Sequence, residues 1–186
     1  MAAYVRRMAL QRGTHQVGPD TGTLRVKTTR EGVAGAAGHD LVLDVTRWKA
    51  TIDVAETISI EVHAEGNSLR VLSGSGGAKP LTDADNAKIE KSINDKVLRG
   101  QAISFRSDAV QIAGDGGRVD VRGQLSLVGS TQAVSFPMSI RGDGSASASV
   151  SVTQSSFGIK PFTAMLGALK VGDKVEIVFE GKVPVS

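Results

Sequence analysis

The sequence contains no cysteine, few aromatic residues and no long apolar run. Without cysteine, the 186-residue chain can form no disulfide, no thiolate nucleophile and no zinc–thiolate site. Its length is still enough for one domain to bury a core without help from disulfides or metals. Disulfide-stapled folds and thiol catalysis are therefore excluded, whereas the cellular compartment is not fixed by this absence.

Aromatic residues make up 4% of the chain, and the net charge is +3, from 22 Lys and Arg against 19 Asp and Glu. A nucleic-acid-binding protein usually combines clustered basic residues with aromatic stacking platforms. Here the charges are scattered along alternating positions, and the basic cluster of Arg6, Arg7 and Arg12 lies in a predicted tail. We therefore expect that nucleic acid is not a partner.

The longest apolar runs are far shorter than the roughly 20 residues that a membrane-spanning helix requires. Residues 1–13 also lack the continuous apolar core of a secretion signal. We therefore expect no integral membrane segment and a cytoplasmic protein. A periplasmic or secreted location is the alternative if the sequence is a processed form.

What the sequence does contain is apolar residues at every second position. Two examples are the row Leu41, Leu43 and Val45 and the row Trp48, Ala50, Ile52 and Val54. Such alternation predicts β-strands that bury one face and leave the other in water. Similar segments recur to the C-terminus and are separated by glycine-rich turn signals, which predicts an antiparallel meander.

Residues 82–98 depart from this alternation. Their apolar positions are four residues apart, at Ile89, Ile93 and Val97. This spacing predicts an amphipathic helix, with a capping box formed by Thr82 and Asp85 and an end at Gly100. A second, short helix is predicted near residues 161–169, after Pro161.

Many strands that are apolar on one face only must hide that face, and a closed barrel does so while removing the sheet edges. The predicted fold is all-β: an extended antiparallel lipocalin-like barrel over residues 22–186, preceded by an N-terminal tail over residues 1–21. Barrels of about eight strands hold either packed side chains or one small ligand. The inner rows favour Ala, Val, Leu and Ile over aromatic residues, which indicates a cavity.

Three stretches of the sequence share their order and spacing with one protein family. The first is Gly-His-Asp-Leu at residues 38–41, which opens a strand leading to Trp48. The second, residues 123–134, has the form G-x-L-x-L-x-G-x-T-x-x-V. The third combines Ser-Phe-Gly-Ile at residues 156–159 with Val-Gly-Asp-x-Val at residues 171–175. Together they resemble the YceI-like family of bacterial lipocalin-like barrels, described as polyisoprenoid binders. The resemblance implies a bacterial protein with a long apolar ligand tail along the barrel axis.

Inward-facing positions are the candidate ligand contacts. They are His39, Leu41, Leu43, Trp48, Ile60, Val62, Phe105, Val121, Leu125, Phe136, Met138, Val150, Phe157, Ile177 and Phe179. Alternation places His39 inside with Leu41 and Leu43, where it is either a structural histidine or a polar anchor for a ligand head group. Trp48 is favoured as a core residue over a ligand contact, and Arg30, at the end of an inward row, is favoured as an ordinary rim charge over a contact for an anionic head group.

No metal site and no cofactor are predicted, because His63 shares its face with Glu61 and Glu65, opposite to that of His39. We expect non-catalytic binding, sequestration or transport of an apolar or amphiphilic ligand, such as a polyisoprenoid, an isoprenoid quinone or a fatty-acid-like lipid. An isomerase or hydrolase-like enzyme with His39 as general base is the alternative, and it should place a second titratable group nearby. A structural β-sandwich with a solid core is a weaker alternative, and a homodimer is left open.

Overall fold

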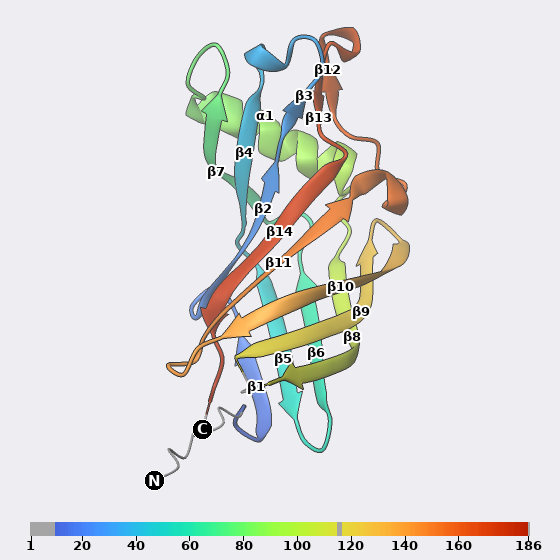
Figure 1. Ribbon diagram of the computed structural model, residues 1–186. Coiled ribbons are helices and arrows are strands. Elements are labelled where there is room, and N and C mark those ends of the chain that lie inside the picture. Colours follow the sequence, from blue (N-terminus) through green and yellow to red (C-terminus); the bar gives the residue numbers. More distant parts are fainter. Residues whose placement is uncertain (1–9, 115–116, 186) are drawn as a thin grey trace.

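The computed structural model in Figure 1 describes residues 10–114 and 117–185. Eleven strands form one sheet: β1 (Gly13–Val17), β2 (Gly22–Thr28), β4 (His39–Val45), β5 (Trp48–Val54), β6 (Ile58–Ala64), β7 (Leu69–Gly76), β8 (Ile103–Ala113), β9 (Arg118–Leu127), β10 (Ser130–Ile140), β11 (Ser145–Thr153) and β14 (Lys174–Lys182). Three short strands form a second sheet: β3 (Arg30–Glu31), β12 (Thr163–Ala164) and β13 (Leu169–Val171). Neighbouring strands in both sheets are antiparallel, as predicted.

The large sheet has the order β1-β5-β6-β8-β9-β10-β11-β14-β2-β4-β7, and it curls because one long hairpin bends halfway. Only Thr46 and Arg47 separate β4 from β5, and the backbone hydrogen bonds from Thr46 N to Ser68 O and from Glu65 N to Arg47 O, both 3.0 Å, continue the hairpin across the bend. The β4 half of the hairpin pairs with β2, whereas the β6 half pairs with β8. The hairpin therefore links the two ends of the strand order, and the predicted lipocalin-like fold is confirmed.

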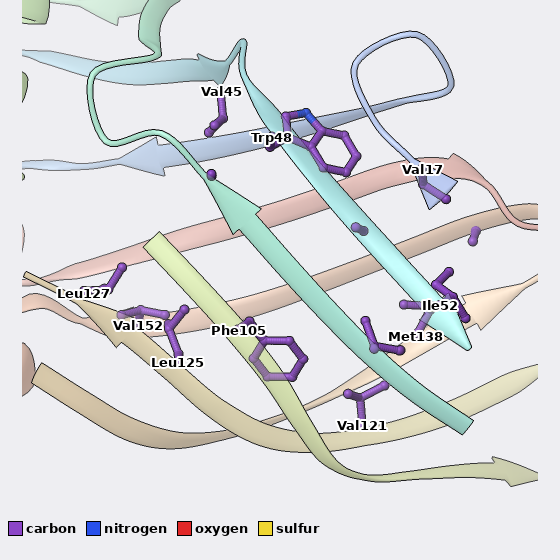
Figure 2. Packing of buried hydrophobic residues seen from close by; sticks show 14 of the residues in the cluster. Val17, Val45, Trp48, Ile52, Phe105, Val121, Leu125, Leu127, Met138 and Val152 are labelled. Carbon is purple, nitrogen blue, oxygen red and sulfur yellow. The ribbon is translucent and has the colours of Figure 1, made fainter. Parts of the chain in front are cut away.

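We call the end that carries the three-stranded sheet the upper half, and the end with β1, β5, β6 and the C-terminus the lower half (Figure 1). In both halves the alternating apolar residues point inward, as predicted. Val119 and Val121 on β9, for example, are each 1% exposed, whereas Arg118 before them and Arg122 after them are exposed. Figure 2 shows this packed interior around Trp48, Ile52 and Met138.

The predicted helix over residues 82–98 is confirmed as α1 (Asp83–Ser92), which continues into a π-helical turn, η2 (Ile93–Val97). It begins with the predicted capping box, in which Thr82 Oγ1 accepts from Asp85 N at 3.2 Å and Asp85 Oδ2 accepts from Thr82 N at 3.1 Å. Glu90 fastens the helix to β7 by accepting from Val71 N at 2.9 Å. Gly100 follows in the left-handed region, at a φ of 65°, which suits a helix end.

Two details differ from the prediction. The helix near residues 161–169 is reduced to a 3-10 turn, η4 (Met165–Gly167), because the flanking segments pair as strands β12 and β13. Positive φ angles at Leu166 and Gly167 close this hairpin and end any right-handed helix. The sheet also begins before residue 22, since β1 pairs with β5 and buries Val17 to 3% exposure. One inward residue on so short a strand is too weak an alternation to recognise. Residues 1–9 of the predicted tail lie outside the described residues.

Two further 3-10 turns, η1 (Gly35–Ala37) and η3 (Gln154–Phe157), connect strands at the upper end. Over the described ranges, no helix has both the length and the apolar character needed to cross a membrane.

Candidate ligand-binding cavity

The upper half of the barrel encloses a cavity of about 400 Å³. Its walls are the inward-facing residues of β2, β4 and β14, such as Leu24, Leu43 and Ile177. Ile89 on α1 and Ile93 on η2 close one side with the apolar stripe that the four-residue spacing predicted. The cavity therefore lies between the curled sheet and the helix, and most of its lining is apolar.

Alternation predicted correctly which side chains point into the barrel. It did not predict how far along the barrel axis each of them lies. His39, Leu41, Leu43 and Ile177 line the cavity. The other predicted contacts are not among the lining residues: Trp48, Ile60, Val62, Phe105, Val121, Leu125, Phe136, Met138, Val150, Phe157 and Phe179. Many of them pack in the lower half, as Figure 2 shows for Phe105, Val121 and Leu125. The ligand-binding role of each stays a prediction.

Larger side chains mark the lower limit of the cavity. Val45 and Ile177 line it, and the next inward residues on the same stretches of chain are Trp48 and Phe179. The rings of Trp48 and Phe179 meet edge to face, with centroids 6.0 Å apart and planes at 87°. We call this pair the aromatic floor. It separates the hollow upper interior from the solid lower one.

The polar residues of the lining come from the upper end and from α1. They are Thr28, Arg30, His39, Lys88, Ser92, Gln154 and Lys170. Gln154 is only 8% exposed, and its Nε2 donates to Gly172 O at 2.9 Å, so this amide is already engaged. Thr28 Oγ1 is buried and has no hydrogen-bond partner among the described residues. The lining contains no carboxylate within the described part of the chain.

His39 is half-buried at this polar end, as the alternation of β4 predicted. Its Nε2 lies 2.8 Å from the carbonyl oxygen of Lys79. Because a carbonyl only accepts, Nε2 carries a proton in this contact, and in the neutral ring Nδ1 is then the acceptor. His63 is exposed on the outer face of β6, also as predicted. Within the described ranges, no three His, Asp or Glu side chains gather in a group that could hold a metal ion.

Sequence reasoning did not find the helix and hairpin residues of the site, which include Lys88, Ser92 and Lys170. The stripe of Ile89, Ile93 and Val97 predicted that α1 buries one side. It did not indicate whether that side meets a packed core or a cavity. Lys170 belongs to β13, which begins at the last residue of the segment predicted as helical.

A curled antiparallel sheet with an apolar internal cavity defines a lipocalin-like class of protein. Within this class, the chain belongs to the YceI-like domain family, whose model matches residues 16–183. No curated protein sequence matches the chain.

Three solved structures share the fold. BcnA of Burkholderia cenocepacia has 14% identity and a TM-score of 0.62, and the match covers 86% of this chain and 94% of that one. A polyisoprenoid binding domain from Saccharophagus degradans, implicated in plant cell wall breakdown, has 10% identity and a TM-score of 0.59, with 92% and 99% covered. The YceI protein of Campylobacter jejuni has 13% identity and a TM-score of 0.57, with 76% and 82% covered.

Proposed function

We propose that the chain binds an apolar or amphiphilic ligand in the upper cavity and sequesters or transports it without transforming it. The observation that carries this proposal is the cavity of about 400 Å³, walled by Leu, Val and Ile side chains. This volume is within the range of small-molecule sites, which are concave, mostly apolar and largely preformed. Membership of the YceI-like family and the fold shared with a polyisoprenoid binding domain support the same ligand class: polyisoprenoids, isoprenoid quinones or fatty-acid-like lipids.

Affinity in such a site comes from removing the ligand tail from water. Burial of apolar surface contributes about 25 cal/mol per Å², or about 0.8 kcal/mol for each methylene group. The walls are already formed by strands and α1, so little conformational entropy of the protein is lost on binding. The polar residues at the upper end would hold the head group while the tail points toward the aromatic floor.

The lining favours binding over catalysis. A general base at His39 would need a second titratable group in position to deliver or receive a proton. The other titratable groups of the lining are Arg30, Lys88 and Lys170, which are cations at neutral pH. Asp85 is held in the capping box of α1 and is not part of the lining.

The proposal is tested first by denaturing extraction of the purified protein, followed by mass spectrometry, which should release an amphiphile in stoichiometric amount. The delipidated protein should then bind geranylgeraniol. Trp48 is the only tryptophan and belongs to the aromatic floor, so its fluorescence should change on binding. Failure of both the extraction and the titration would contradict the proposal.

A matched pair of variants on β14 locates the site. Val175→Phe would extend a ring into the cavity, whereas Val178→Phe changes the opposite face of the same strand. We expect Val175→Phe to weaken geranylgeraniol binding at least tenfold and Val178→Phe to leave it within about twofold. Because a ring in an empty cavity displaces no protein atoms, Val175→Phe should fold; equal binding by both variants would place the ligand elsewhere.

A further inference from the structure

The charged groups that line the cavity are all basic, and we propose that this end selects ligands with an anionic head group, a carboxylate or a phosphate. The inference rests on the proposed function and names its ligand class. The cations are Arg30, Lys88 and Lys170, which come from β3, α1 and β13, and His39 on β4 lies among the same lining residues. Three separate elements thus bring positive charge to the lining of one apolar cavity.

Arg30 is positioned by neutral partners, so its charge is not cancelled. Its Nη1 donates to Gly38 O at 2.9 Å and to Ser75 O at 3.3 Å. Its backbone N donates to Asp40 Oδ1 at 2.7 Å, which uses the acid without pairing it to the guanidinium. Nε and Nη2 have no partner among the described residues. A half-buried guanidinium held in this way can present its remaining donors to the two oxygens of a carboxylate or phosphate.

Lys88 and Lys170 are also without an ion-pair partner among the described residues. The contrast with Lys91 on the same helix is direct, since Lys91 Nζ lies 2.6 Å from Asp95 Oδ2 and does not line the cavity. Lys88 lies on the lining side of α1 next to Ile89, so its aliphatic stem can cover the tail while its ammonium group remains near the mouth.

Among the described residues, no acid forms an ion pair with Arg30, Lys88 or Lys170. Asp85 accepts from both the hydroxyl and the backbone of Thr82, and Asp40 accepts from the backbone of Arg30. Glu31 is exposed and lies opposite Lys170 in the pairing of β3 with β13, but no ion pair joins them. None of the three carboxylates belongs to the cavity lining. A neutral head group would therefore leave the three cations without an anion inside the cavity, whereas an anionic one would gain charge-assisted hydrogen bonds from half-buried Arg30 and from the exposed Lys88 and Lys170.

The test compares two ligands that differ only in the head group: geranylgeranyl monophosphate and geranylgeraniol. Both are titrated into delipidated full-length protein by calorimetry and by Trp48 fluorescence, at low and high salt. We expect the phosphate to bind about 10- to 100-fold more tightly than the alcohol, because hydrogen bonds between charged groups contribute more than neutral ones. We also expect this preference to shrink as salt increases, since exposed charges are screened.

Variants assign the preference to this end of the cavity. Lys88→Gln should reduce the preference for the phosphate over the alcohol about three- to tenfold, whereas Lys91→Gln, its matched control on α1, should leave this preference unchanged. Arg30→Gln should reduce the phosphate preference further. A thermal melt of this variant shows whether loss of the hydrogen bonds to Gly38 and Ser75 has also destabilised the fold. Because Lys88 is exposed on α1, its variant should fold and tests the inference even if Arg30→Gln fails to fold.

The outcomes separate this inference from the proposed function. Equal affinity for phosphate and alcohol would overturn the anionic head group and leave the lipid-binding proposal standing. Absence of binding by both ligands, together with an empty extract, would overturn both. Inorganic phosphate is the third arm, because the same cations could serve a free anion. If it binds as tightly as geranylgeranyl monophosphate, the site recognises the anion without the tail, and the amphiphile is excluded.

Discussion

The two halves of the barrel use the same alternation of apolar residues and reach different interiors. In the lower half, Phe105 and Phe136 pack with ring centroids 5.7 Å apart, and Met138 is 8% exposed in the same buried core. In the upper half the inward residues are mostly Leu, Val and Ile, and they surround a cavity of about 400 Å³. Periodicity therefore decides which side of a strand is buried. The volume of the buried side chains decides whether they fill the interior or leave a cavity.

The covering elements differ as well. The lower half is built from long paired strands, and glycine allows close packing there: a Cβ on Gly123 would lie 2.7 Å from the ring of Phe105. In the upper half, α1 and η2 lie over the sheet, and the cavity lies between these helical turns and the strands. We infer that the lower half supplies most of the stability of the fold and the upper half supplies the binding site. Three predictions test this division.

The largest effect is expected where a charge enters the solid half. Met138→Asp would bury a carboxylate with no partner in the described interior, at a cost of about 4 kcal/mol or more in the free energy of unfolding. The matched control is Ser139→Asp on the next residue of β10, which is exposed and pairs in register with Arg118. Its effect should stay within about 0.5 kcal/mol. Urea unfolding of both variants measures the difference, and similar losses would mean that the register of β10 is wrong.

The second prediction removes the boundary between the halves. Phe179→Ala would take away one ring of the aromatic floor and cost about 3 kcal/mol, at the lower end for such truncations because Phe179 is only half-buried. The cavity should then extend downward, so the variant should gain affinity for longer polyprenols relative to geranylgeraniol. The wild-type protein should not bind the longer polyprenols more tightly than geranylgeraniol. An unchanged chain-length preference in a folded variant would show that the floor does not limit the tail.

In the strands that it identified, sequence alternation was sufficient to predict which face is buried, because burial on one side imposes a period of two on the inward row. It predicted His39 inside and His63 outside, and the spacing from Thr82 to Asp85 predicted the start of α1. It did not predict levels along the barrel axis, because Val121 and Ile177 look alike in sequence although one is in the core and the other lines the cavity.

Long-range pairing accounts for the remaining differences. β1 is stabilised by its register with β5, where Val17 lies opposite Ala50, and this partner is distant in the sequence. β13 pairs with β3, in which Lys170 and Val171 lie opposite Glu31 and Arg30. These pairings bring Arg30 and Lys170 to one place, so the basic end of the cavity could be recognised only once the chain is folded.

The smallest effect concerns the element that covers the cavity. Thr82→Ala would remove the hydroxyl that accepts from Asp85 N, and loss of such a cap typically costs about 1 kcal/mol. We expect amide hydrogens of α1 to exchange about fivefold faster in the variant, because local opening of the helix becomes that much more favourable. Amides of β9 should keep their wild-type rates. Equal acceleration in β9 would show that α1 and the lower half open together, contrary to the division proposed above.

Acid should weaken the same cap in the wild-type protein. Hydrogen bonds from the side chain and backbone of Thr82, together with the charges of Lys88 and His39, lower the pKa of Asp85 below its ordinary value of 3.8. A carboxyl whose pKa is lower in the folded state stabilises that state above 3.8, and this contribution is lost as the pH falls through the lowered pKa. Protection of α1, corrected for intrinsic exchange, should therefore decrease below about pH 4. Asp85→Asn should lack this acid-dependent step, and an identical pH profile in the two proteins would assign the loss of protection to another group.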